Sequence, residues 1–189
     1  MIFNIESLAV IFAIIYLILA AKEDVKCWYA AIISSILYIY IMYDADLIME
    51  SMLQIFYVLM AVYGWLQWNN IVDKKIKLKI KSWRKINHIY AILLIIVLSI
   101  ISGMLLQKYT EAALPFMDAF TTWGAIISTY MVAKKILENW IYWFVIDSIS
   151  IYLYVSRELY LTAILFLIYL IIIFFGYKSW KKKLDSINE

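Results

Sequence analysis

The 189-residue chain is 66% hydrophobic and only 16% charged, with a formal net charge of +3 at pH 7. A soluble domain of this length could not hide so much apolar surface, because much of any folded surface stays exposed. The single Cys and single His exclude an internal disulfide and argue against a Cys/His metal site. We therefore expect a membrane protein that needs no metal or other cofactor.

The apolar residues come in continuous blocks, each long enough for a membrane-spanning helix of about 17–25 residues. In chain order, the predicted helices cover 5–21, 25–43, 46–68, 86–106, 115–133, 138–155 and 158–177. The blocks do not alternate apolar and polar residues, which argues against β structure. The first block lacks a basic start and a clear cleavage site, so we interpret it as a permanent helix. The predicted fold is an all-α polytopic membrane protein with seven transmembrane helices.

The basic residues predict how the chain crosses the membrane. Of the 17 Lys and Arg residues, all except Lys108 and Arg157 lie in or beside the turns after the first, third, fifth and seventh helices. Cytoplasmic loops carry the excess of Lys and Arg, so we expect the N-terminus outside and the C-terminus in the cytoplasm. The run KKIKLKIKSWRK at 74–85 is interpreted as a topology determinant on anionic headgroups, and not as a nucleic-acid site.

Two stretches of the chain resemble each other, YGWLQW at 63–68 and FGYKSW at 175–180. In an alignment without gaps, 5–68 lies over 117–180 with 13 identities in 64 positions. This predicts two copies of one three-helix unit, joined by a linker helix at 86–106. With one helix between them the copies are parallel, as in carriers whose substrate site lies between the repeats. Gly64 and Gly176, which coincide, are expected to allow close helix contact.

Polar side chains at bilayer depth are costly, so they should face protein or a water-filled cavity. The third, fifth and sixth predicted helices each carry such residues at three- and four-residue steps, which places them on one helical face. Every stripe mixes hydrogen-bonding groups, small residues and aromatic rings. The candidate substrate contacts are Gln54, Tyr57, Trp65, Asp118, Thr122, Trp143, Asp147 and Ser150.

Asp147 is the most informative of these residues, because it carries a charge near the middle of a predicted span. Its counterpart in the first copy is Ser35, so the repeated fold does not require the charge. One interpretation is a counter-charge for a cationic substrate that stacks on Trp143, one turn away. The other is a hydrogen-bonded or protonated Asp that ties helices together.

Other candidates also keep two interpretations. Gln54 can bind an amide-like or pyrimidine edge, or it can join two helices. Trp65 is a candidate for a gate or cage, whereas Trp68 and Trp180 are interpreted as belt residues at the membrane interface. Asp118 is either a substrate contact or a charge that stabilises the start of its helix.

Three segments carry a resemblance to a known family: LQIFYVLMAVYGWLQW, PFMDAFTTWGAIISTYMVAKKILENW and WFVIDSISIYLYVSRELYLTAILFLIY. They resemble the PnuC-type vitamin transporters. The resemblance implies a homotrimer of seven-helix protomers, each with a 3+1+3 arrangement similar to the SWEET sugar carriers. It also implies substrate contacts at Gln54, Tyr57, Thr122, Trp143 and Asp147.

The resemblance further implies a function in a bacterial cytoplasmic membrane. Most members take up nicotinamide riboside for NAD biosynthesis, and relatives take up thiamine or riboflavin. Transport is expected to be facilitated diffusion, after which a cytoplasmic kinase phosphorylates and traps the vitamin. The alternatives are a thiamine transporter of the same family, the vitamin-binding subunit of an ATP-driven importer, and a scaffold or sensor. The chain lacks a Ser–His or paired-Asp signature, so we do not expect an enzyme.

Overall fold

The computed structural model of the chain describes residues 2–44, 48–69, 78–110, 114–156 and 160–188. Within these ranges the protein forms seven helices and no named strand. The helices are α1 (Ile2–Ala21), α2 (Cys27–Asp44), α3 (Ile48–Trp68), α4 (Lys85–Tyr109), α5 (Pro115–Ala133), α6 (Asn139–Ser156) and α7 (Tyr160–Asn188). The all-α fold with seven helices is confirmed. Only α7 departs clearly from its predicted range, because the Lys-rich segment after Trp180 continues the helix to Asn188.

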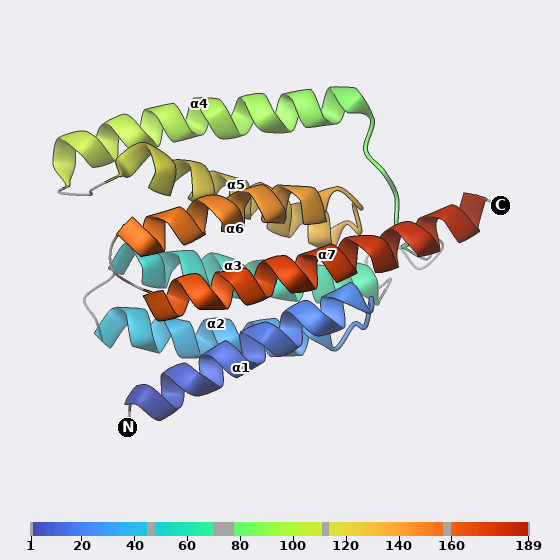
Figure 1. Ribbon diagram of the computed structural model, residues 1–189, viewed down its shortest axis with the longest axis horizontal. Coiled ribbons are helices and arrows are strands. Elements are labelled where there is room, and N and C mark those ends of the chain that lie inside the picture. Colours follow the sequence, from blue (N-terminus) through green and yellow to red (C-terminus); the bar gives the residue numbers. More distant parts are fainter. Residues whose placement is uncertain (1, 45–47, 70–77, 111–113, 157–159, 189) are drawn as a thin grey trace.

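The helices form a bundle in which α4 lies at one edge (Figure 1). We call α1–α3 the first half and α5–α7 the second half. Consecutive helices pack against each other within each half, and α4 packs against α5. The two halves meet where α1 packs on α7 and where α3 packs on α5.

The outer surface of the bundle is apolar. Large side chains on α4 such as Ile89, Leu93 and Ile101 are about half exposed, and similar residues line the outside of the other helices. Among the described helices, α4 and the segment Ala163–Ser186 are long and apolar enough to cross a membrane on length and composition alone. Ile5–Ala21 and Cys27–Ile41 are shorter apolar helical segments. An apolar exterior of this kind suits a hydrocarbon solvent.

One end of the bundle carries the α1–α2 turn, the α5–α6 turn and the C-terminal part of α7 (Figure 1). We call it the basic end, because Lys22, Lys134, Lys135 and the lysines at 178–183 lie there. The predicted basic residues Lys74, Lys75, Lys77 and Arg157 lie outside the described residues.

The α1–α2 and α5–α6 turns at the basic end have the same backbone geometry. Glu23 and Lys135 occupy equivalent positions and both have positive φ, at 63° and 52°. The N–H of the next residue, Asp24 or Ile136, donates to a carbonyl five residues earlier at 2.9 Å in both turns. Positive φ is uncommon for residues with a Cβ. Its occurrence at equivalent positions in the two turns shows that the sequence similarity extends to local structure.

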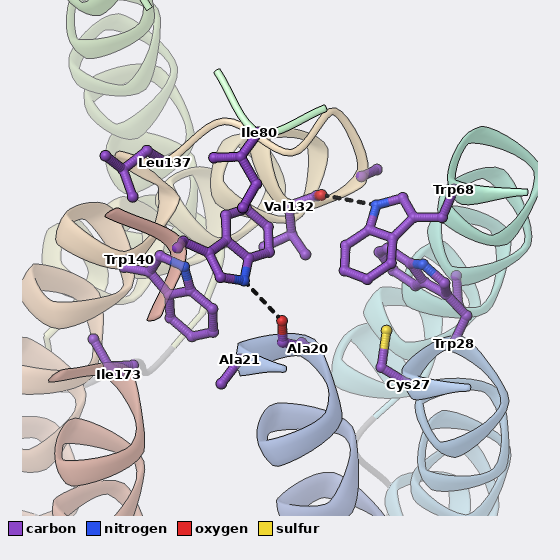
Figure 2. Close-up of a cluster of buried hydrophobic side chains, with 13 residues drawn as sticks. Ala20, Ala21, Cys27, Trp28, Trp68, Ile80, Val132, Leu137, Trp140 and Ile173 are labelled. Carbon is purple, nitrogen blue, oxygen red and sulfur yellow. Dashed lines mark hydrogen bonds between the residues drawn. The ribbon is translucent and has the colours of Figure 1, made fainter. Parts of the chain in front are cut away.

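Four tryptophans form the core of the basic end (Figure 2). The ring of Trp28 lies over Gly64, where a Cβ would come within 2.3 Å of it, and Trp140 lies over Gly176 in the same way, at 2.6 Å. The prediction that these glycines allow close contact is therefore confirmed. Trp68 is 7% exposed and Trp180 is fully buried, so the interpretation of both as belt residues was wrong. An indole in an interfacial belt faces lipid headgroups, whereas these two face other tryptophans.

Candidate substrate site between the two halves

Asp147 lies near the middle of α6 and is buried, with 3% of its surface exposed. Tyr57 of α3 and Asp147 of α6 belong to helices whose described backbones make no close contact. Asp147 lies within electrostatic range of the hydroxyl of Tyr57 in α3. The structure therefore brings together two of the predicted site residues from opposite halves.

Three further tyrosines lie in the same region of the bundle. Tyr169 of α7 lies within electrostatic range of Asp147 and of two other tyrosines, Tyr38 of α2 and Tyr154 of α6. Tyr169 is the repeat counterpart of Tyr57, a relation visible in the sequence when 5–68 is laid over 117–180. Sequence reasoning did not select it, because the second copy offered no polar stripe around it. Tyrosines of α2, α3, α6 and α7 therefore lie in the same part of the bundle as Asp147, which we call the polar centre.

Other predicted residues extend this centre along the helices. Ser150 is buried one turn beyond Asp147. Gln54 is half-buried one turn from Tyr57 on α3, and Trp143 is half-buried one turn from Asp147, packed against the tryptophan core. Thr122 of α5 is half-buried and is not linked to this centre by any described contact.

Two predicted residues lie toward the ends of the bundle. Trp65 donates its indole N–H to the hydroxyl of Tyr29 at 2.9 Å, within the first half and near the basic end. Asp118 lies in the first turn of α5, which begins at Pro115, and its backbone N–H donates to Leu114 at 3.0 Å. A carboxylate in the first turn interacts favourably with the helix dipole. The position of Asp118 thus suits the predicted stabilising role at the helix start.

At the candidate site, the two halves carry different residues at equivalent positions. The counterpart of Asp147 is Ser35, which is buried in α2. The counterpart of Gln54 is Phe166, whose ring centroid lies 5.0 Å from that of Tyr154 and 5.3 Å from that of Tyr169. The first half therefore supplies an amide, and the second half supplies a carboxylate and aromatic rings that contact each other at tilted angles. Such a site can distinguish the two ends of an asymmetric ligand.

The groups at this centre are a buried carboxylate, tyrosine hydroxyls and aromatic rings, which together can accommodate a flat cation. No described residue donates a hydrogen bond to Asp147 or forms an ion pair with it. A buried carboxylate in such surroundings is stable when it is protonated or when it meets a cation. The described Lys and Arg residues lie at the bundle ends, and no three His, Cys, Asp or Glu side chains among the described residues gather to hold a metal ion.

A polar centre between two halves of an apolar helical bundle is typical of a multi-pass membrane transporter, and the comparison with known families gives the same class. The family model described as "Nicotinamide mononucleotide transporter" matches residues 4–182. The chain belongs to this family, which consists of transporters and not enzymes.

Individual relatives agree with this assignment. The nicotinamide riboside transporter PnuC of Escherichia coli strain K12 is 23% identical over 93% of this chain and 84% of its own length. The riboflavin/roseoflavin transporter RibM of Streptomyces davaonensis is 24% identical over 64% of this chain and 58% of its own. A crystal structure of the vitamin B3 transporter PnuC matches the fold with a TM-score of 0.78 at 21% identity, over 96% of this chain and 82% of that chain.

Proposed function

We propose that the protein mediates facilitated uptake of a cationic vitamin precursor, and that this precursor is nicotinamide riboside. The single observation that carries the proposal is the buried Asp147, which has no cationic partner among the described residues. Nicotinamide riboside carries a pyridinium charge on a flat ring, which suits a carboxylate flanked by aromatic side chains. The amide of Gln54 and the hydroxyls of Tyr57 and Tyr169 supply hydrogen bonds for the polar edges.

The proposed substrate is the nucleoside and not its phosphorylated form. Binding a phosphate in a membrane interior needs Arg or Lys side chains to match its charge. The described basic residues near the bundle axis lie at its end, away from Asp147. A phosphorylated ligand would place its negative charge near the carboxylate. Phosphorylation by a cytoplasmic kinase after uptake would therefore trap the vitamin.

The proposed mechanism is alternating access. We take α1–α3 and α5–α7 to be two parallel copies of one unit, since their turns and buried Trp–Gly contacts recur at equivalent positions. The substrate stacks near Asp147, and the halves rock to expose it first to one face and then to the other. We further propose a homotrimer in the bacterial cytoplasmic membrane, with the basic end in the cytoplasm.

Two specific alternatives follow from the relatives and the site. Thiamine carries a thiazolium charge and would use the same carboxylate. Riboflavin is named as a substrate of the RibM relative, whose sequence identity to this chain, 24%, is close to the 23% of the PnuC relative. Riboflavin is neutral, so the charge of Asp147 would not increase its binding affinity.

Ligand titration of the purified protein tests the proposal, with intrinsic Trp fluorescence as the signal. Trp143 lies one turn from Asp147 and should report binding. We expect saturable quenching by nicotinamide riboside and little response to nicotinamide mononucleotide. Saturation by thiamine or riboflavin alone would leave the site in place and replace the substrate. Equal affinity for the mononucleotide would contradict the proposed site chemistry.

A further inference from the structure

The two halves exchange equivalent hydrogen bonds at the basic end. Trp68 of α3 donates its indole N–H to the carbonyl of Val132 in α5 at 3.3 Å, and Trp180 of α7 donates to the carbonyl of Ala20 in α1 at 2.9 Å (Figure 2). The two donors occupy equivalent positions in the two halves, and so do the two acceptors. Each half therefore holds the end of the other half's first helix by the same bond.

An ion pair lies beside these hydrogen bonds. Lys135, only 7% exposed, pairs with the carboxylate of Glu23, and its ammonium lies 4.6 Å from the centre of the Trp68 ring. Lys183 of α7 also contacts Glu23, at 3.3 Å. Glu23 and Lys135 occupy equivalent positions in the two turns. Because the two positions carry opposite charges they attract each other, whereas identical charged residues would have repelled each other.

Contacts within a half differ from contacts between halves. Trp28 packs over Gly64 inside the first half, and Trp140 packs over Gly176 inside the second half. Between the halves, the rings of Trp68 and Trp180 meet at a centroid distance of 6.0 Å. Rocking of the halves would preserve the Trp–Gly contacts and break the Trp68–Trp180 contact, both indole hydrogen bonds and the ion pair.

The closed arrangement also leaves two donors without partners. The indole N–H groups of Trp28 and Trp140 are buried and donate to no described residue. They occupy equivalent positions, so the feature belongs to both halves. A buried unpaired donor destabilises the closed arrangement relative to an open one in which water can reach it. An element that opens and closes needs a small difference in free energy between its two arrangements, and the unpaired donors reduce this difference.

We propose that Glu23, Trp68, Lys135 and Trp180 form a reciprocal clamp that closes the basic end of the path between the halves. The clamp holds this end shut in the present structure and must open for substrate to pass. The inference rests on the proposed transport function, but its opening can be measured without any substrate.

The test is the labelling rate of a buried cysteine by a maleimide in nanodiscs, where both faces of the protein are accessible. The parent carries Cys27→Ala and Ala61→Cys, because Ala61 is 1% exposed and belongs to the core behind the clamp. Trp68→Phe combined with Trp180→Phe keeps an aromatic ring at both positions and removes both hydrogen bonds. We expect labelling to become roughly tenfold faster, the effect of losing two neutral hydrogen bonds on an equilibrium.

The matched control is Trp123→Phe. It removes an indole hydrogen bond of 3.0 Å to Ser102, between α5 and α4 and not between the halves. A second comparison separates opening from misfolding: Lys135→Met should speed labelling, and Lys135→Arg should label as slowly as the parent. The clamp is contradicted if the double Trp variant and Lys135→Met label no faster than Trp123→Phe. Faster labelling in a protein that binds none of the vitamins tested would support the clamp and reject the substrate assignment.

Discussion

At the scale of single residues, the charge of Asp147 decides between its two interpretations. Asp147→Asn keeps the size and hydrogen-bonding capacity of the side chain and removes the charge. We expect affinity for nicotinamide riboside to fall at least about tenfold, because a charge pair in a site of reduced dielectric contributes several kcal/mol at about 4 Å. Fluorescence titration of the purified variant measures the change.

Stability measurements on the same variant test the other interpretation. A buried charge without a partner is costly, so Asp147→Asn should unfold at an unchanged or higher temperature. Ser148→Ala, on the same helix, is the matched control, since the Ser148 hydroxyl donates only to Phe144 of its own helix at 2.7 Å. Unaltered affinity together with a lower unfolding temperature would assign Asp147 to helix packing.

Tyr169 provides a second prediction at this scale, because it joins the site through its equivalence with Tyr57. Tyr169→Phe keeps the ring and removes the hydroxyl that the charge of Asp147 reaches. We expect a several-fold loss of affinity, in line with one neutral hydrogen bond. Tyr152→Phe on α6, where the ring is 58% exposed, should bind as the unmodified protein does. Equal affinities of Tyr169→Phe and Tyr152→Phe would show that the Tyr169 hydroxyl does not contribute to substrate binding.

At the scale of helices, the glycines under the tryptophans should tolerate no side chain. Alanine stabilises a helix by about 1 kcal/mol relative to glycine, whereas overpacking costs about 1–3 kcal/mol. At Gly64 and Gly176 the added Cβ would meet Trp28 at 2.3 Å and Trp140 at 2.6 Å. Both rings are fully buried. We therefore expect the overpacking penalty to exceed the gain in helix propensity, so that both variants lose stability.

Gly103→Ala is the control for these variants. Its Cβ would approach Phe116 at 2.5 Å, but the Phe116 side chain is 42% exposed and can turn away. Thermal unfolding in detergent should therefore rank Gly103→Ala above Gly64→Ala and Gly176→Ala. The same order of stability for all three would show that the tryptophans adapt to an extra methyl group.

The helices were the most predictable part of the molecule, and the roles of individual tryptophans the least. Continuous apolar blocks and Pro115 at the start of α5 are local signals, so the helix ranges could be derived from the sequence. Burial of Trp68 and Trp180 depends on contacts between segments far apart in the chain. An aromatic residue near a predicted span end has the same sequence pattern whether it faces lipid or protein.

The ion pair at the basic end could not be predicted from the sequence either. Glu23 and Lys135 are far apart in the chain, and each alone resembles an ordinary solvated turn residue. Their meeting follows from how the halves pack and not from either local pattern. By contrast, the importance of Asp147 was visible in the sequence, since an isolated charge in an apolar span is itself a strong signal, and the structure buries this residue near the middle of α6.

At the scale of the whole molecule, the distribution of basic residues predicts a single orientation. In a Cys27→Ser background, Ser186→Cys places a thiol on the exposed C-terminal part of α7, and Tyr109→Cys places one at the other end of the bundle. We expect an impermeant thiol reagent added to intact cells to label the second and spare the first. Inside-out vesicles should give the reverse pattern, and labelling of Ser186→Cys in intact cells would invert the proposed topology.

Uptake by the protein alone tests the central claim most directly. Proteoliposomes that contain only this chain should take up labelled nicotinamide riboside until the inside and outside concentrations are equal. They should not take up nicotinamide mononucleotide at a comparable rate, because no described Lys or Arg lies beside Asp147 to meet a phosphate. No uptake by the lone protein would favour the binding subunit of an ATP-driven importer. Uptake of the mononucleotide as fast as the nucleoside would contradict the proposed site.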